Sequence, residues 1–267
     1  LTNGSSYYGG GLSCYDGSSP ALENCIFRDN MGTIEGGGVH LRENCDPTFS
    51  NCRFEDNFAI GPGGGMFCIE GSNPTLTNCT FENGTGLILG GGMFNYSSSP
   101  ALTDCTFTSN NAYDYGGGMY NGESSPTLTN CTFTDNTANY GGGMFNQESS
   151  NPTLTNCTFT ENSATEAGGG MYSYESGNPT LTDTTVCGNT PDQIIGDWTD
   201  NGGNTIADVC PWDCPADVNQ DGVVDVNDIL TLVGAWGSSG PLGDINDDGT
   251  VNVVDLIMML KSWGPCE

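Results

Sequence analysis

The chain has 267 residues and is strongly acidic, with 33 Asp and Glu against four Lys and Arg and a net charge of −29. This balance repels nucleic acid and anionic membrane surfaces and favours metal cations as partners. No stretch is apolar for long enough to cross a membrane, and neither a start methionine nor a signal peptide is present. We therefore expect a mature, exported protein that acts outside the cell or at its surface.

A glycine-rich unit repeats seven times in the first part of the chain. Its triple glycines and the prolines that follow them both recur every 25 to 27 residues, at Gly9, Gly36, Gly63, Gly90, Gly116, Gly141 and Gly168, and at Pro20, Pro47, Pro74, Pro100, Pro126, Pro152 and Pro179. A fixed period of this length, rich in Thr and Asn, is typical of a solenoid of short strands. We expect an all-β parallel β-helix of seven coils over residues 1–190, with each triple glycine at a tight corner.

Each unit contains two short strands, as in 153–155 and 157–160, joined by a bend at Asn156. Asn tolerates the left-handed backbone of such a bend, and equivalent residues of successive coils should lie about 4.8 Å apart. We expect an inward ladder of bend residues, whose Asn-x-Ser/Thr sequences are then structural and carry no sugar. Its members are Asn24, Asn51, Asn78, Asp104, Asn130, Asn156 and Asp183.

The same stacking predicts four inward columns that fill the coil. They are Leu76, Leu102, Leu128 and Leu154; Cys25, Cys52, Cys79, Cys105, Cys131 and Cys157; Phe27, Phe54, Phe81, Phe107, Phe133 and Phe159; and Met66, Met93, Met119, Met144 and Met171. The cysteines are expected to be buried free thiols, because stacking keeps their Cβ atoms farther apart than a disulfide prefers.

The combination of Phe-x-x-Asn, as in Phe133 to Asn136, with Gly-Gly-Gly-Met resembles the repeats of bacterial surface β-helices, including chlamydial polymorphic outer-membrane proteins. This resemblance covers roughly residues 1–190 and implies a right-handed parallel β-helix. Such coils occur in adhesins, in polysaccharide lyases and in uncharacterised exported proteins, so the resemblance implies fold and leaves function open.

The turn before each proline places an acid in one column on six of the seven coils. These acids are Asp16, Glu43, Glu70, Glu123, Glu148 and Glu175. Like charges one strand spacing apart repel, and no basic residue is expected opposite them. A row of Ca²⁺ ions between coils would offset this repulsion, since Ca²⁺ prefers six to eight oxygen ligands. The alternative is a solvated acidic face.

A further column follows the methionines and contains Phe67, Phe94, Tyr120, Phe145 and Tyr172. Exposed rings could stack on sugars, but corner packing is the preferred interpretation. The only histidine, His40, together with Arg28 and Arg42 would supply the basic groups of an active site, yet no inserted loop is present to carry one. A β-helix polysaccharide lyase or hydrolase is therefore the least favoured class.

The repeat decays after Cys187, and residues 191–214 are expected to form a cap and linker. Residues 215–267 then contain two calcium loops with oxygen ligands at positions 1, 3, 5, 7, 9 and 12 and glycine at position 6. The first supplies Asp217, Asn219, Asp221, Val223, Asp225 and Asp228; the second supplies Asp244, Asn246, Asp248, Thr250, Asn252 and Asp255. Each loop is expected to lead into an apolar helix, 229–236 or 256–263.

The two loop-helix units resemble a type I dockerin, in the variant of exported planctomycete proteins that has a cysteine at each end. The resemblance implies a small α-helical calcium-binding domain and a Cys214–Cys266 clasp, with Cys187–Cys210 in the cap. Loop positions 10 and 11, which are polar in cohesin-binding dockerins, are Val226, Asn227, Val253 and Val254 here. They depart from that pattern, so a cohesin-like or other cell-surface partner is an open expectation.

The favoured function is that of a non-enzymatic, calcium-stabilised extracellular structural protein. Because the chain begins within a coil, at Leu1, we expect its open first coil to be covered by the C-terminal region of another copy, giving a head-to-tail filament. The alternative is a monomeric adhesin or polysaccharide-binding protein anchored by its dockerin-like module.

Overall fold

The structure is a computed structural model that describes residues 1–210, 214, 216–219, 223–238, 242–246 and 248–265. The chain divides into two compact units, Leu1–Ile206 and Ala207–Glu267.

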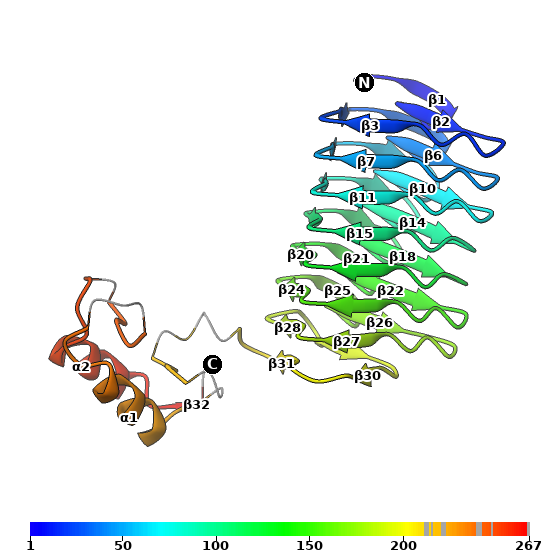
Figure 1. Ribbon diagram of the computed structural model, residues 1–267. Helices are drawn as coiled ribbons and strands as arrows, with labels where there is room; N and C mark the ends of the chain where they lie inside the picture. The colour runs from blue at the N-terminus through cyan, green and yellow to red at the C-terminus, as the bar shows by residue number, and fades with distance from the viewer. Residues whose placement is uncertain (211–213, 215, 220–222, 239–241, 247, 266–267) are drawn as a thin grey trace. The chain divides into compact units, whose positions relative to one another are not determined.

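The first unit is a parallel β-solenoid of about seven coils, as the repeat predicts, and its strands stack into four sheets (Figure 1). The first sheet contains β1 (Ser5–Tyr8), β5 (Met31–Glu35), β9 (Phe58–Ala59), β13 (Thr85–Gly86), β17 (Asn111–Ala112), β21 (Thr137–Tyr140) and β25 (Ser163–Ala167). The second contains β2 (Leu12–Cys14), β6 (Val39–Leu41), β10 (Met66–Ile69), β14 (Met93–Tyr96), β18 (Met119–Gly122), β22 (Met144–Gln147), β26 (Met171–Ser173) and β29 (Ile194–Ile195).

The other two sheets are built from the strand pair that the alternation of apolar and β-branched residues predicts. The third contains β3 (Ala21–Glu23), β7 (Thr48–Ser50), β11 (Thr75–Thr77), β15 (Ala101–Thr103), β19 (Thr127–Thr129), β23 (Thr153–Thr155), β27 (Thr180–Thr182) and β30 (Thr199–Asp200). The fourth contains β4 (Ile26–Arg28), β8 (Arg53–Glu55), β12 (Thr80–Glu82), β16 (Thr106–Thr108), β20 (Thr132–Thr134), β24 (Thr158–Thr160), β28 (Thr185–Cys187) and β31 (Thr205–Ala207).

The interior consists of the four predicted columns of Leu, Cys, Phe and Met, which are confirmed as one core. The Phe column forms a continuous stack; Phe107 and Phe133, for example, have centroids 4.6 Å apart and planes within 1° of parallel. The six column cysteines are free thiols. Burial raises the pKa of Cys52 to about 11, so its thiol stays protonated at neutral pH.

The triple glycines form the predicted tight corners. The first glycine of each block is left-handed, with φ of 68° at Gly116, for example. A Cβ on the next residue, Gly117, would lie 2.4 Å from the carbonyl oxygen of Thr137 in the following coil. Only glycine therefore allows the corners to stack at strand spacing.

The bend residues are left-handed, as predicted, with φ of 51° at Asn156, but their expected inward direction is wrong. Asn130 and Asn156 lie on the surface, where Asn156 donates a side-chain hydrogen bond of 2.9 Å to Asn130. The left-handed bend turns these side chains outward, and the next residue, such as Cys157, enters the core.

The buried ladder is instead formed by the last residue of Phe-x-x-Asn and, on the last coil, by the equivalent Asn189, which follows Val186. Its members are Asn30, Asn57, Asn110, Asn136, Asn162 and Asn189, all buried. Asn136 Nδ2 donates to the carbonyl oxygen of Phe107 and to Asn162 Oδ1, both at 2.9 Å. The ladder ends at Gln193, whose Oε1 accepts from Asn189 Nδ2 at 2.9 Å.

Residues 191–206, expected as a cap, add β29, β30 and the start of β31 to the sheets of the solenoid. Ile194 and Trp198 pack against the end of its core. Cys187, Cys210 and Cys214 are disulfide-bonded. The expected pairing of these cysteines stays a prediction, and Cys266 lies outside the described residues.

The second unit contains helices α1 (Val226–Gly234) and α2 (Val253–Lys261) and an antiparallel pair, β32 (Val223–Val224) with β33 (Gly264–Pro265). Its core repeats across the two loop-helix units, with Val224 and Val251 at one repeated position and Leu232 and Met259 at another.

The helix bounds expected from the sequence, 229–236 and 256–263, are wrong. Each helix begins three residues earlier, because the residue at loop position 9 is its N-cap and the aspartate at position 12 completes a capping box. The N-caps are Asp225 and Asn252, and their box partners are Asp228 and Asp255.

Candidate functional site

The acidic column of the solenoid lies where the sequence predicts it. Asp16, Glu43, Glu70, Glu123, Glu148 and Glu175 occupy equivalent left-handed turns, with φ between 46° and 63°. The expectation that no basic residue faces them is wrong, however, since Arg42 Nε lies 2.9 Å from Glu70 and 3.4 Å from Glu43. A hydrogen bond with Asp16 raises the pKa of Glu43.

Farther along this column, hydroxyl and amide groups donate to the carboxylates. Glu123 accepts from Tyr96 Oη at 3.0 Å and from Ser97 Oγ at 2.9 Å. Glu148 accepts from Gln147 Nε2 at 2.9 Å. Protein donors therefore already offset part of the repulsion that calcium was expected to relieve, and calcium binding by this column stays a prediction.

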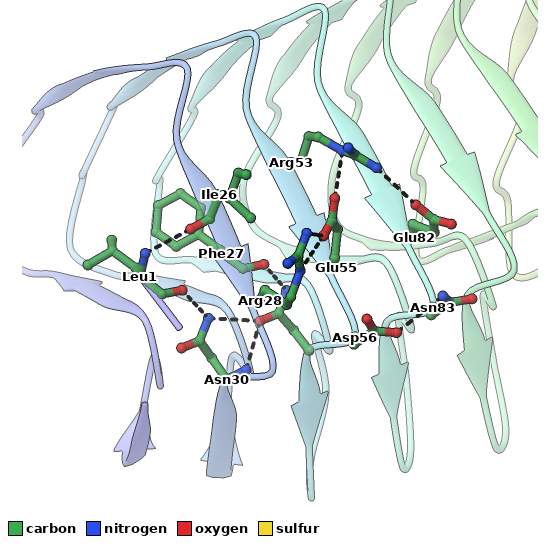
Figure 2. Close-up of polar contacts among 11 residues, drawn as sticks. Leu1, Ile26, Phe27, Arg28, Asn30, Arg53, Glu55, Asp56, Glu82 and Asn83 are labelled. Atoms are coloured by element: carbon green, nitrogen blue, oxygen red, sulfur yellow. Dashed lines mark hydrogen bonds and ion pairs between the residues drawn. The ribbon is translucent and has the colours of Figure 1, made fainter. Parts of the chain in front are cut away.

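A second polar cluster lies on the fourth sheet and spans three coils (Figure 2). The buried carboxylate of Glu55 contacts Arg28 and lies 2.6 Å from Arg53 Nε. Arg53 also reaches Glu82 at 3.4 Å. Since the charges of these groups neutralise one another, the cluster holds three coils together. It is also the grouping of acidic and basic side chains on the solenoid that most resembles a catalytic site.

His40 does not join that cluster, because Arg28 lies on the fourth sheet and His40 on the second. It is buried in the aromatic column, where it stacks on Phe67 at 5.1 Å, and its Nε2 lies 3.5 Å from Glu35 Oε2. Burial lowers the pKa of His40 to about 4. The buried imidazole is therefore neutral near neutral pH.

The second predicted calcium loop is held together by hydrogen bonds to its own oxygen-bearing side chains. Asp244 accepts from the backbone N–H groups of Asp248 and Gly249, at 3.1 and 2.8 Å. Asn246 Oδ1 accepts from Asp248 N at 3.1 Å, and Asn252 Nδ2 donates to the carbonyl oxygen of Thr250 at 2.8 Å. The loop thus already curls around its carboxylate and amide groups.

The aspartate that ends each loop is fully buried. Asp255 accepts from the backbone N–H groups of Ile245, Asn246 and Asn252, and Asp228 accepts from those of Asn219 and Asp225. Burial opposes ionisation of Asp255, but these N–H groups outweigh it and lower its pKa. The carboxylate of Asp255 is therefore built to be charged.

The side chains predicted to bind metal in these two loops carry oxygen donors, a set that suits a hard cation such as Ca²⁺. Asp217 is buried and Val223 lies in β32, whereas Asp221 falls outside the described residues. Within the part of the chain that is described, no group of three or more His, Cys, Asp or Glu side chains is gathered tightly enough to hold a metal. The fit to calcium rests on the donor chemistry of the loops.

The aromatic column lies at a packed corner, as preferred from the sequence: Phe67, Phe94, Tyr120 and Phe145 are buried. The pocket at the end of this column was not predicted from the sequence. There a pocket of about 430 Å³ is lined by Tyr115, Tyr140, Phe145, Gln147, Tyr172 and Tyr174. The sequence signal was the pair Tyr172 and Tyr174, because no earlier coil has tyrosines at both of these equivalent positions.

The description "Right handed beta helix region" belongs to a family model that matches residues 2–121 and 38–208. These matches together span more than half of the chain. Comparisons with curated proteins and with solved structures found no match.

Among the described residues, no helix has the length and apolar character that a membrane span requires.

Proposed function

Because the chain belongs to the right-handed β-helix family, we propose that it is a non-enzymatic extracellular scaffold, a rigid solenoid joined to a calcium-binding unit. The observation that carries this proposal is that the polar side chains of the coils are bonded to one another along the stack. The asparagine ladder and the Arg28, Glu55 and Arg53 cluster both serve coil-to-coil contact. Coils of nearly equal length also leave no inserted loop that could carry a reaction.

Incubation of the protein with a panel of neutral and acidic polysaccharides tests the absence of catalysis. We expect no new reducing ends and no unsaturated sugars. Glu55→Gln is the informative variant, because Glu55 is the buried acid between two arginines. Cleavage by the wild type that Glu55→Gln abolishes would overturn the scaffold role and establish a lyase or hydrolase.

Calcium binding is proposed for the second unit. Asp217, Asn219, Asp221, Val223, Asp225 and Asp228 would hold one ion, and Asp244, Asn246, Asp248, Thr250, Asn252 and Asp255 the other. Bound Ca²⁺ would neutralise the loop carboxylates. Calorimetric titration should give one ion per loop, and Asp248→Asn should remove one of them. Glu123→Gln is the matched control on the solenoid column; a lower ion count in that variant would show that the column also binds calcium.

Head-to-tail assembly of the solenoid into filaments is a second proposal. Within the described residues, β1, β2, β3 and β4 are the first strands of the four sheets, and an edge strand can pair with another chain. At the opposite end of the solenoid, Gln193 accepts the last hydrogen bond of the asparagine ladder and Trp198 packs against the core. A different surface of the neighbouring copy would therefore have to pair with strands β1 to β4. Electron microscopy and sedimentation with calcium should show filaments; a monomer at high protein concentration would exclude them.

A further inference from the structure

The tyrosine pocket exists because one column of side chains stops before the solenoid does. The residue before each triple glycine pairs with its counterpart on the next coil, from Leu89 to Tyr115, from Tyr115 to Tyr140 and from Tyr140 to Ala167. Tyr115 and Tyr140 stack at 5.5 Å, but Ala167 has no ring to continue that stack. The volume that a ring at position 167 would fill is therefore left open beside Tyr140.

The walls of this space offer aromatic faces in two orientations. Tyr140 meets Tyr172 edge to face, with centroids 5.6 Å apart and planes at 74°. Tyr172 in turn stacks on Phe145 at 5.4 Å and lies 6.4 Å from Tyr174. A flat ligand with an apolar face can lie against one ring while its edge meets another.

Polar groups are also available at the pocket. No hydrogen bond within the described residues uses the hydroxyls of Tyr115, Tyr140 or Tyr172. Gln147 accepts from Tyr120 Oη at 3.3 Å and donates to Glu148 at 2.9 Å, which fixes its amide at the wall. A ligand that carries several hydroxyl groups around an apolar ring would complement this arrangement.

The surroundings of the pocket are negatively charged. Burial and the nearby charge of Glu166 raise the pKa of Tyr140, and the charge of Glu175 raises that of Tyr174. With Glu148 against Gln147, three carboxylates border the site. Uronic acids and sulfated sugars would be repelled, because like charges at this range are unfavourable.

We propose that the pocket lined by Tyr115, Tyr140, Tyr172 and Tyr174 binds a pyranose unit of a glycan that lacks acidic groups. The C–H face of a pyranose is apolar and its edge carries hydroxyls, which matches rings bordered by free phenolic groups. A volume of about 430 Å³ is within the usual range of small-ligand sites. This site goes beyond the scaffold role and would give the solenoid the binding function of an adhesin.

Isothermal titration with cellohexaose, chitohexaose and mannohexaose tests the proposal, with hexagalacturonate as the acidic comparison. We expect saturable binding of a neutral or N-acetylated hexasaccharide and none of hexagalacturonate. Ala167→Tyr should fill the pocket by extending the existing stack and weaken binding at least about tenfold. Tyr140→Ala should weaken binding similarly by removing the central ring.

Tyr113→Ala is the matched control, because Tyr113 is 68% exposed and does not line the pocket. It should bind the same sugar with unchanged affinity, and thermal unfolding should show that all three variants are folded. Binding that survives in both Ala167→Tyr and Tyr140→Ala would overturn the proposal. So would no binding of any neutral hexasaccharide, or saturable binding of tetramethylammonium alone, which would identify an aromatic cage for cations.

Discussion

Asn136 shows how single side chains connect the coils of this protein. Its side chain donates to Phe107 and Asn162, and its Oδ1 accepts from the backbone N–H and the side chain of Asn110, both at 3.0 Å. All of these groups are buried, so each depends on Asn136 to replace the hydrogen bonds that water would have supplied.

Asn136→Ala should therefore destabilise the solenoid strongly. Buried groups left without a partner cost about 1–3 kcal/mol each, and we expect a loss of at least about 3 kcal/mol in urea unfolding. Asn111→Ala is the control, because Asn111 is exposed and its side chain donates to Thr137 Oγ1 on the surface. Equal losses of unfolding free energy in the two variants would show that the buried ladder stabilises the solenoid no more than a surface hydrogen bond does.

His40 makes the stability of the solenoid depend on pH, and the burial of its ring determines the sign of this dependence. Its pKa falls from 6.5 to about 4 on folding, so the unfolded chain binds the proton first. The stability contributed by neutral His40 is complete above pH 6.5 and is lost as the pH falls towards 4. The charged groups around it are Glu35, Arg42 and Glu70, and Tyr8 and Tyr15 pack against its ring.

His40→Phe should remove this dependence, since Phe67 and Phe94 occupy the same register position in the next coils. The difference in unfolding midpoint between variant and wild type should grow between pH 6.5 and 4. A difference that stays constant over this range would mean that His40 does not titrate on unfolding there.

Among the structural elements, the glycine corner sets how closely the coils stack. The Cβ of Gly117→Ala would come within 2.4 Å of Thr137 O and 2.5 Å of Gly142 O, and both are backbone atoms that cannot move alone. We expect this variant to lower the unfolding midpoint of the first unit sharply or to prevent folding. A midpoint close to that of the wild type would contradict the close stacking of the corners.

Gly234→Ala should act in the opposite direction in the second unit. Gly234 is the last residue of α1, and a Cβ there would meet nothing within 4 Å. Alanine favours the helix over glycine by about 1 kcal/mol, so the melting temperature of this unit should rise. A decrease would indicate a contact that the isolated helix geometry does not show.

For the whole molecule, the two compact units have separate cores and should unfold in separate transitions. Chelation of calcium should lower only the transition of the second unit, because a ligand stabilises the state that binds it. Calorimetry with and without EDTA, and with Asp255→Asn, measures this. If chelation shifts the solenoid transition as well, calcium binds there too or the units unfold together.

The repeat period alone determined the solenoid, its corners and its four core columns. A coil of constant length places equal residues above one another whatever the finer geometry, so columns such as Phe107 and Phe133 follow directly from spacing. The oxygen-rich loops at Asp217 and Asp244 are likewise visible as spacing. Their role in metal binding follows from donor chemistry and stays a proposal.

Only the tertiary structure decided which side of the coil each polar column faces and what meets it there. A bend can turn Asn130 outward while Asn136, six residues later, points inward, because the direction depends on backbone angles that residue type does not determine. The contact of Arg42 with Glu70 and the pocket beside Ala167 arise between coils 25 to 28 residues apart in the chain. Their geometry depends on side-chain packing between neighbouring coils, which spacing does not specify.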